Sequence, residues 1–466
     1  MAFVLASVAA LALALALTIS GGQFDWIAMA PLAVAVGASL VAPFSKPDAD
    51  RLSDERSARL VHWILVAATT SHLVLSLVVP MQTPAAREAR IEMAAAVGFA
   101  GVVWGLYLWR REWVGRHGFA VLVSVFLALG VVAIRSNPEP HIDVWVFQQQ
   151  GAAALSHGIN PYEVMFPNIY TPEQSLRFYG PTWLERGYIN TYPYPPAILL
   201  AEVASFLLTG DYRYALLGSI VLAALGMVYL APHDRRRIAE LAALCFLYSP
   251  TTLFVMTLGW TEPIVVVAWV GAVIAARRLL TCVEPSPLGT ERWLAGASLG
   301  VLATTKQYSV LLLLPPLLRA VGRLRRGCEL GWATLATAII VVPFLVWNPR
   351  EFVHDVVVGL FRQPLRVDAL SMLAIWGRMV GPEQVPHVAV LGAFVAAAIV
   401  VVWAPMPAGN LGRAACSSGA AVIVFLFLNK LAFCNYYWLA FYLLCASVAI
   451  GEGTREKGSI GGSLRR

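Results

Sequence analysis

The chain has 466 residues, of which 59% are hydrophobic and 13% charged, and its mean hydropathy is +0.69. A soluble globular domain is nearer half apolar and a quarter charged, so this composition excludes a soluble enzyme and predicts a polytopic membrane protein. The net charge of +7 comes from short basic clusters at the ends of apolar runs, which signals membrane topology and argues against a nucleic-acid partner.

Apolar runs of about 17 to 22 residues recur along the chain, and each can cross a hydrocarbon core of roughly 30 Å. We expect an all-α fold with about 14 transmembrane helices. The first run lacks a basic flank, which favours an uncleaved helix over a signal peptide. Two runs, 293–305 and 308–318, must tilt or break because they are short. The expected spans are 2–20, 24–44, 60–80, 93–109, 118–134, 214–231, 238–257, 263–279, 293–305, 308–318, 329–347, 387–404, 414–428 and 436–450.

The stretch 196–209 decides the topology, because its length suits an interfacial or re-entrant helix better than a full span. With that interpretation most of the 34 Lys and Arg residues fall on the cytoplasmic side, as the positive-inside rule requires. Both termini are then cytoplasmic, and two long loops, 135–196 and 348–386, face the outside of the plasma membrane. The six cysteines form no CxxC pair, so their spacing predicts neither a zinc site nor a disulfide framework.

The loop 135–196 is polar and aromatic, and it places an acid, Asp143, just beyond the end of a span. A helix-compatible sequence follows this acid, and Gly158 is placed to end that helix. Asp143 is a candidate general base near an apolar interface. The alternative is that it only caps the helix N-terminus, as aspartates often do.

Two proline motifs follow in the same loop, Asn160-Pro161-Tyr162 and Tyr192-Pro193-Tyr194-Pro195-Pro196. Proline fixes its own φ and pushes the preceding residue toward an extended conformation, so both motifs predict rigid corners that carry aromatic rings. They could wall a binding site, or they could be ordinary loop structure at an interfacial aromatic belt.

An acid followed by Gly-x-Asn-Pro-Tyr and Tyr-Pro-Pro, in an outer loop of a many-helix membrane protein, resembles the GT-C glycosyltransferases. The chain is most similar to family 87, the polyprenol-phosphate-mannose-dependent α-mannosyltransferases. The match is good over 135–320 and looser toward the C-terminus, where FLNKLAFCNYYW has a similar character. The family has one helix before the acid loop, whereas five are expected here, so four helices are an addition.

The resemblance implies a membrane catalytic domain over 111–450, with the additional helices within 1–110 and a disordered cytoplasmic tail over 451–466. It also implies that Asp143 is the base of an inverting transfer of a hexose, expected to be mannose. The donor would be a polyprenyl-phosphate sugar, and the acceptor a glycolipid or glycan on the outer face.

The donor phosphate needs cations, since Lys and Arg bind phosphate as a point charge or a fork. Lys306, Arg366 and Lys430 are the predicted phosphate ligands, and Arg362 and Arg378 are further outer-face candidates. For Lys306 the alternative is snorkelling at a short helix end, and for Arg366 it is an ion pair with Asp368. The predicted substrate contacts are His141, Asn160, Tyr162, Tyr192, Tyr194, Glu262, Gln307, Asn435 and Tyr436.

A metal cofactor is not expected, because no second acid stands within two residues of Asp143 to complete an oxygen-rich site. Two other classes stay open. A lipid or solute transporter could use the same intramembrane charges as its substrate path. A non-catalytic scaffold for envelope synthesis would tolerate the loss of both Asp143 and Lys306.

Overall fold

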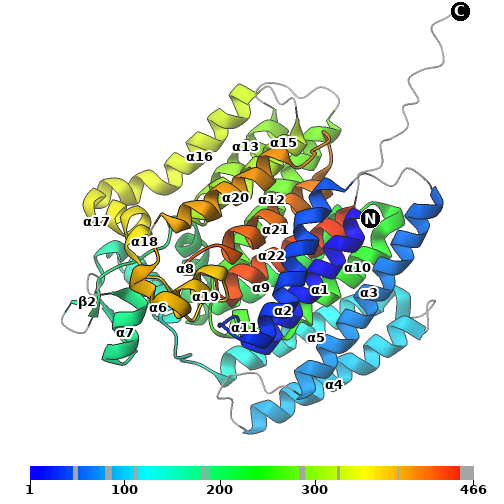
Figure 1. Cartoon of the computed structure of the whole chain (residues 1–466), viewed down its shortest axis with the longest axis horizontal. Helices are drawn as coiled ribbons and strands as arrows, with labels where there is room; N and C mark the ends of the chain where they lie inside the picture. Colours follow the sequence, from blue (N-terminus) through cyan, green and yellow to red (C-terminus); the bar gives the residue numbers. More distant parts are fainter. Residues whose placement is uncertain are drawn as a thin grey trace, which may run out of the picture.

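The computed structural model describes residues 1–45, 51–78, 87–109, 114–180, 184–185, 188–282, 289–322, 326–386 and 388–451. These residues form an all-α membrane protein with one very small sheet. The expected disordered tail, apart from its first residue Gly451, lies outside the described residues. Figure 1 shows long helices running roughly alongside one another, with short helices gathered at one end of them.

Five helices precede the loop 135–196, which we name the outer loop after its predicted side of the membrane. They are α1 (Ala2–Ser20), α2 (Trp26–Val41), α3 (Arg51–Val78), α4 (Arg87–Trp109) and α5 (Val114–Ser136), with the 3-10 turn η1 (Ala42–Phe44) after α2. The outer loop contains α6 (Asp143–Ser156), the turn η2 (Pro161–Glu163) and α7 (Pro172–Tyr179). It also contains strands β1 (Phe166–Pro167), β2 (Leu184–Glu185) and β3 (Tyr188–Ile189), which pair antiparallel in the order β1-β3-β2. The all-α prediction did not include this sheet.

The rest of the chain is helical. It comprises α8 (Pro196–Thr209), α9 (Arg213–Leu230), η4 (His233–Arg235), α10 (Arg236–Leu247), α11 (Pro250–Thr257), α12 (Glu262–Thr281), α13 (Thr290–Ala303), α14 (Gln307–Leu312), α15 (Leu314–Val321), α16 (Arg326–Trp347), α17 (Pro349–Val353), the π-helical turn η5 (His354–Val358), α18 (Gly359–Arg362), α19 (Met372–Val380), η6 (Pro382–Gln384), α20 (Ala389–Trp403), α21 (Leu411–Phe427) and α22 (Cys434–Ile450).

Eight helices within the described ranges are long and apolar enough to cross a membrane, and they coincide with eight of the 14 expected spans. They are Ala2–Ser20, Trp26–Phe44, Glu55–Val78, Glu88–Trp109, His117–Ser136, Arg213–Leu230, Glu262–Thr281 and Cys328–Trp347. The other six expected spans are shorter or broken helices, so the count of 14 stays a prediction.

Prolines explain the two breaks inside expected spans. The span 238–257 is divided into α10 and α11, which meet at an angle of 53° where Ser249 precedes Pro250. The span 308–318 is divided into α14 and α15, and Pro315 and Pro316 open the second helix. Proline lacks the N–H that a continuous helix needs and disfavours helical conformation in the residue before it, so each helix restarts there.

Helix α22 lies at the centre of the bundle and is buried along almost its whole length. It packs against α1, α9, α10, α12 and α21. Helix α1 contacts α22, and α2 contacts α21, so the first two helices belong to the same packed body as the rest of the domain. By contrast, only 6% of the residues in the apolar stretch of α16 are buried. This helix packs chiefly on α13, where Gly296 and Gly300 allow close approach.

Helix α6 ends as its sequence predicts. Gly158 has φ +73°, the left-handed conformation that glycine adopts without strain. Its N–H donates to the Leu155 carbonyl at 3.0 Å, and the Ile159 N–H donates to the Ala154 carbonyl at 2.9 Å. These two bonds form a Schellman motif, which fixes the direction of the chain as it leaves α6.

Candidate active site

A cavity of about 1280 Å³ lies where the outer loop meets the ends of the central helices. Ten of the predicted site residues line it: His141, Asp143, Tyr194, Glu262, Lys306, Gln307, Arg366, Lys430, Asn435 and Tyr436. They come from the start of α6 and the residues before it, the segment before α8, the start of α12, the start of α14 and the residue before it, the 363–371 segment, the α21–α22 turn and the start of α22. Residues that are far apart in sequence therefore share one site.

Asp143 is the first residue of α6 and is partly buried at the cavity wall. Its Oδ2 accepts a hydrogen bond from the Tyr179 hydroxyl at 2.6 Å, and its Oδ1 accepts one from the Val144 N–H at 2.8 Å. Ile142, not Asp143, occupies the N-cap position. The carboxylate is thus anchored on both oxygens and also faces the cavity, which the capping alternative alone does not explain.

Two tyrosines surround this carboxylate. Tyr170 accepts a hydrogen bond from the Asp143 N–H at 3.2 Å, and its ring lies 6.2 Å from that of Tyr179. Burial, and then the negative charge of Asp143, raise the pKa of both phenols far above their ordinary value. Both hydroxyls therefore stay protonated, and Tyr179 remains a donor to Asp143 at every physiological pH.

Lys306 forms a buried ion pair with Glu262. Lys306 Nζ lies 3.3 Å from Glu262 Oε1, and the two side chains are 6% and 0% exposed. The Tyr308 hydroxyl donates to the same oxygen at 3.4 Å, and the ring centroid of Tyr194 lies 4.5 Å from Lys306 Nζ. The other carboxylate oxygen, Oε2, has no hydrogen-bond partner among the described residues. The sequence predicts that Lys306 binds phosphate. In the structure, the Glu262 carboxylate neutralises much of the Lys306 charge.

Arg366 forms the ion pair with Asp368 that the sequence left as an alternative. Its guanidinium donates two hydrogen bonds of 2.8 Å to that carboxylate, and it stacks on the rings of Phe178 and Phe433 at 3.9 and 4.7 Å. Arg177 approaches the same carboxylate at 3.9 Å. Burial raises the pKa of Asp368, but the hydrogen bonds and charge of Arg366 outweigh it and hold that pKa below its usual range.

Of the three predicted phosphate ligands, Lys430 is the one whose charge is least neutralised by carboxylates. Its ammonium donates to the carbonyls of Gln363 and Phe361 at 2.6 and 3.1 Å, and among the described residues no carboxylate forms an ion pair with it. An ammonium has three donors, so two bonds to neutral carbonyls leave one donor and the full charge for an anion in the cavity. Burial lowers the pKa of Lys430 to about 8.

Of the two proline motifs, only the second reaches the cavity, through Pro193 and Tyr194. Asn160 caps η2 through the Tyr162 N–H, and the Tyr162 hydroxyl donates to the Tyr194 carbonyl at 2.8 Å. The Tyr192 hydroxyl donates to Gln148 at 2.5 Å, and its N–H donates to Asp355 at 2.7 Å. The cavity lining does not include Asn160, Tyr162 or Tyr192, and the rings of Tyr162 and Tyr192 pack in a second aromatic core. Their contact with a substrate stays a prediction.

Other candidates also have local roles. Gln307 lines the cavity, but its amide donates to the carbonyls of Pro193 and Val356 at 3.1 and 2.9 Å and so ties the Tyr-Pro-Pro loop to η5. Arg378 donates to the Val367 carbonyl and stacks on Phe24. Neither Arg362 nor Arg378 lines the cavity.

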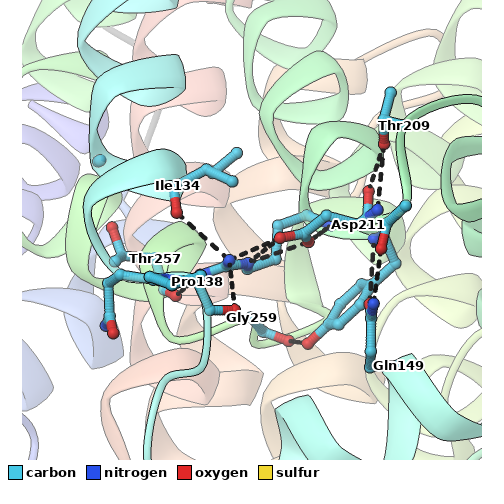
Figure 2. Close-up of polar contacts among 12 residues, drawn as sticks. Ile134, Pro138, Gln149, Thr209, Asp211, Thr257 and Gly259 are labelled. Atoms are coloured by element: carbon cyan, nitrogen blue, oxygen red, sulfur yellow. Dashed lines mark hydrogen bonds and ion pairs between the residues drawn. The ribbon is translucent and has the colours of Figure 1, made fainter.

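A buried arginine fixes the chain segment that leads to Asp143. Arg213 pairs with Asp211 at 2.6 Å and donates to the carbonyls of Asn137 and Thr257 at 2.8 and 2.9 Å. In Figure 2 the bonds from Ile134, Pro138 and Thr257 meet at this guanidinium, which also bonds Asp211. The end of α5, the loop before α6 and the end of α11 are thus held together.

Several lining residues were missed by sequence reasoning. Tyr170, Tyr179 and Arg177 lie in the same loop as Asp143, yet nothing in their spacing marks them as its neighbours. Ser20, Gly21 and Gln23, in the α1–α2 turn, also line the cavity. Only the folded loop brings these residues to Asp143, so no local motif could have identified them.

Within the part of the chain that the structure describes, one group of side chains has the spacing of metal ligands: Glu351, His354 and Asp355, outside the cavity lining. The buried Asp355 carboxylate already accepts the Tyr192 N–H and lies 3.0 Å from His354 Nδ1. These hydrogen bonds join the outer loop to η5, which accounts for the group without an ion.

No protein-family model, curated protein or solved structure matches the chain. The resemblance to GT-C glycosyltransferases therefore rests on residue patterns in the sequence alone.

Proposed function

We propose that this protein is an inverting glycosyltransferase of the cell membrane that transfers a hexose, mannose by resemblance, from a polyprenyl phosphate to an acceptor on the outer face. The observation that carries the proposal is the cavity itself. It combines a partly buried carboxylate, Asp143, with the cations Lys430, Lys306 and Arg366 and with an apolar section.

The apolar section suits a prenyl chain. Leu311, Val390, Phe394, Phe425 and Leu426 line it, from α14, α20 and α21. Leu311 is 50% exposed on the outside of the bundle, next to Val310 at 47%. A lipid donor could therefore lie with its tail against these helices and its phosphate at the polar part of the cavity. Burial of apolar carbon contributes about 25 cal/mol per Å², so the tail supplies much of the donor affinity.

The proposed reaction is a single displacement. Asp143 takes the proton of an acceptor hydroxyl, and the oxygen attacks the anomeric carbon of the sugar. The bond between that carbon and the phosphate oxygen breaks, and the phosphate leaves with the electron pair. Lys430 stabilises the departing charge, since its ammonium has one donor unused by the protein. Tyr179 holds the Asp143 carboxylate in position through its hydrogen bond.

The test is to supply purified protein with radiolabelled polyprenyl-phosphate mannose and a glycolipid extract from the outer membrane leaflet. A glycosyltransferase releases free polyprenyl phosphate and labels the acceptor fraction. A transporter, which the buried Lys306–Glu262 pair would also suit, moves the donor but leaves it intact. An intact donor after incubation would therefore contradict the proposal.

A further inference from the structure

The turn between α1 and α2 belongs to the cavity, although four of the helices before the outer loop look like an addition in sequence. Ser20, Gly21 and Gln23 line the cavity together with Asp143 and Arg366. In Figure 1 this end of the α1–α2 hairpin lies near α11 and α19, at the end of the molecule that carries α6 and α7. The N-terminal hairpin therefore supplies part of the site.

The turn is held tightly against the start of α22. Gly22 has φ +78°, and a Cβ at this position would overlap the backbone nitrogen and Cα of Cys434. Only glycine permits this approach, both for its left-handed backbone and for its lack of a side chain. Asn435 and Tyr436, which follow Cys434, line the same cavity. The turn and the start of α22 thus form one continuous wall.

The turn is also bonded to the segment that carries Arg366. The Phe24 N–H donates to the Asp368 carbonyl at 2.8 Å, and Gln23 forms an isolated antiparallel bridge with Ala369. The Arg378 guanidinium stacks on the Phe24 ring at 4.2 Å. Two of these contacts come from the segment that carries Arg366 and the third from α19, so the backbone of Gln23 is fixed next to the segment where Arg177 approaches Asp368.

Gln23 is the residue of this turn that is free to bind a ligand. Its side chain is exposed, and its amide forms no hydrogen bond with any described residue. An amide both donates and accepts hydrogen bonds, which suits a sugar hydroxyl. The apolar section, lined by α14, α20 and α21, is suited to the donor's lipid chain. The polar side, which holds Gln23, Gln174 and Arg177, is then left for the acceptor.

We propose that Gln23 binds a hydroxyl of the acceptor glycan, so that the N-terminal hairpin sets acceptor selectivity. This inference rests on the proposed function. It gives the added helices α1 and α2 a direct part in the reaction, through the turn that joins them.

The test compares Gln23→Leu with a matched control, Gln384→Leu, in the full-length protein. Gln384 is an exposed glutamine of η6 that does not line the cavity. Transfer is measured from polyprenyl-phosphate mannose, the donor, to octyl α-D-mannopyranoside, the acceptor. For each variant, the donor KM and the acceptor KM are determined separately. Because one neutral hydrogen bond is lost, Gln23→Leu should raise the acceptor KM by about three- to tenfold. The donor KM and the melting temperature should not change, and the control should behave like wild type.

The outcomes separate the two proposals. An unchanged acceptor KM in Gln23→Leu, with an active wild type, overturns the role of Gln23 and leaves the glycosyltransferase intact. A raised donor KM with an unchanged acceptor KM also overturns it, because the turn would then face the donor. A wild type that transfers no mannose contradicts the proposed function, and the inference falls with it.

Discussion

Replacing Arg213 tests how the structure positions Asp143. The Arg213 side chain is 0% exposed and pairs with Asp211, whose side chain is 17% exposed, while its other donors serve main-chain carbonyls of the segment before α6. Arg213→Met would remove the guanidinium from that carboxylate, which would keep only the N–H of residue 213, and would leave those carbonyls without their donor. Removing one partner of a buried pair costs about 3–5 kcal/mol. Because Asp211 retains some contact with solvent, we expect a loss near the lower end, about 3 kcal/mol.

The assay is thermal unfolding of the purified protein followed by tryptophan fluorescence, together with turnover. The control is Arg236→Met, because Arg236 is 66% exposed and forms only an i,i+4 pair with Glu240 at 3.3 Å. Such a pair contributes about 0.3–0.5 kcal/mol. Arg213→Met should therefore unfold clearly below both wild type and the control, and its turnover should fall as the segment 137–142 loses its anchor. Equal melting temperatures for the two variants would refute this reasoning.

Three further predictions concern the cavity. Lys306→Met should destabilise the protein by about 3–5 kcal/mol because it leaves Glu262 buried without its ion-pair partner. In a double-mutant cycle, adding Glu262→Gln should recover most of that stability. If the losses of the two single variants simply add, the pairing is disproved. The donor KM should rise as pH increases through about 8, because Lys430 loses its charge there; Lys430→Arg should abolish that rise, and a persisting rise would assign the titration elsewhere. Gly22→Ala should lower the melting temperature and raise the acceptor KM, because the new Cβ would overlap the start of α22. Gly37→Ala, with open space around the new Cβ, should change neither quantity.

The helices were predictable because their physics is local. A run of apolar residues long enough to span a bilayer needs no tertiary information, and eight such runs are helices of the expected kind. The break at Pro250 was visible in the sequence but was not predicted. Its effect became clear only when α10 and α11 met at 53°.

The site was predictable where a residue type is unusual for its place. Asp143, Glu262, Lys306 and Lys430 are charged residues beside apolar runs, and all four line one cavity. Their partners were not predictable, since pairing depends on how distant helices pack. The Lys306–Glu262 pair joins residues 44 positions apart, as its sequence numbers show.

Motif order was a weaker guide to contact. Asn160, Tyr162 and Tyr192 were predicted to bind substrate because they stand in a recognisable series, but none of the three lines the cavity, and both tyrosine hydroxyls donate within the loop. Conversely, the α1–α2 turn carries no motif and still reaches the cavity. A turn's position depends on long-range packing, here of α1 on α22, which a local sequence pattern does not encode.

The most direct test of the proposed mechanism is the turnover of Asp143→Asn beside Asp25→Asn. Asparagine keeps one oxygen to accept the Val144 N–H, and its amide N–H can donate to the Tyr179 hydroxyl in place of the present bond, so the fold should persist. It cannot take a proton from the acceptor. Asp25 caps α2 through the Ile27 and Ala28 N–H groups, a role that asparagine fills equally well. The account predicts that Asp143→Asn lowers mannose transfer by roughly 10²–10⁴-fold while Asp25→Asn matches wild type. Transfer by Asp143→Asn at close to the wild-type rate would contradict the assignment of the base.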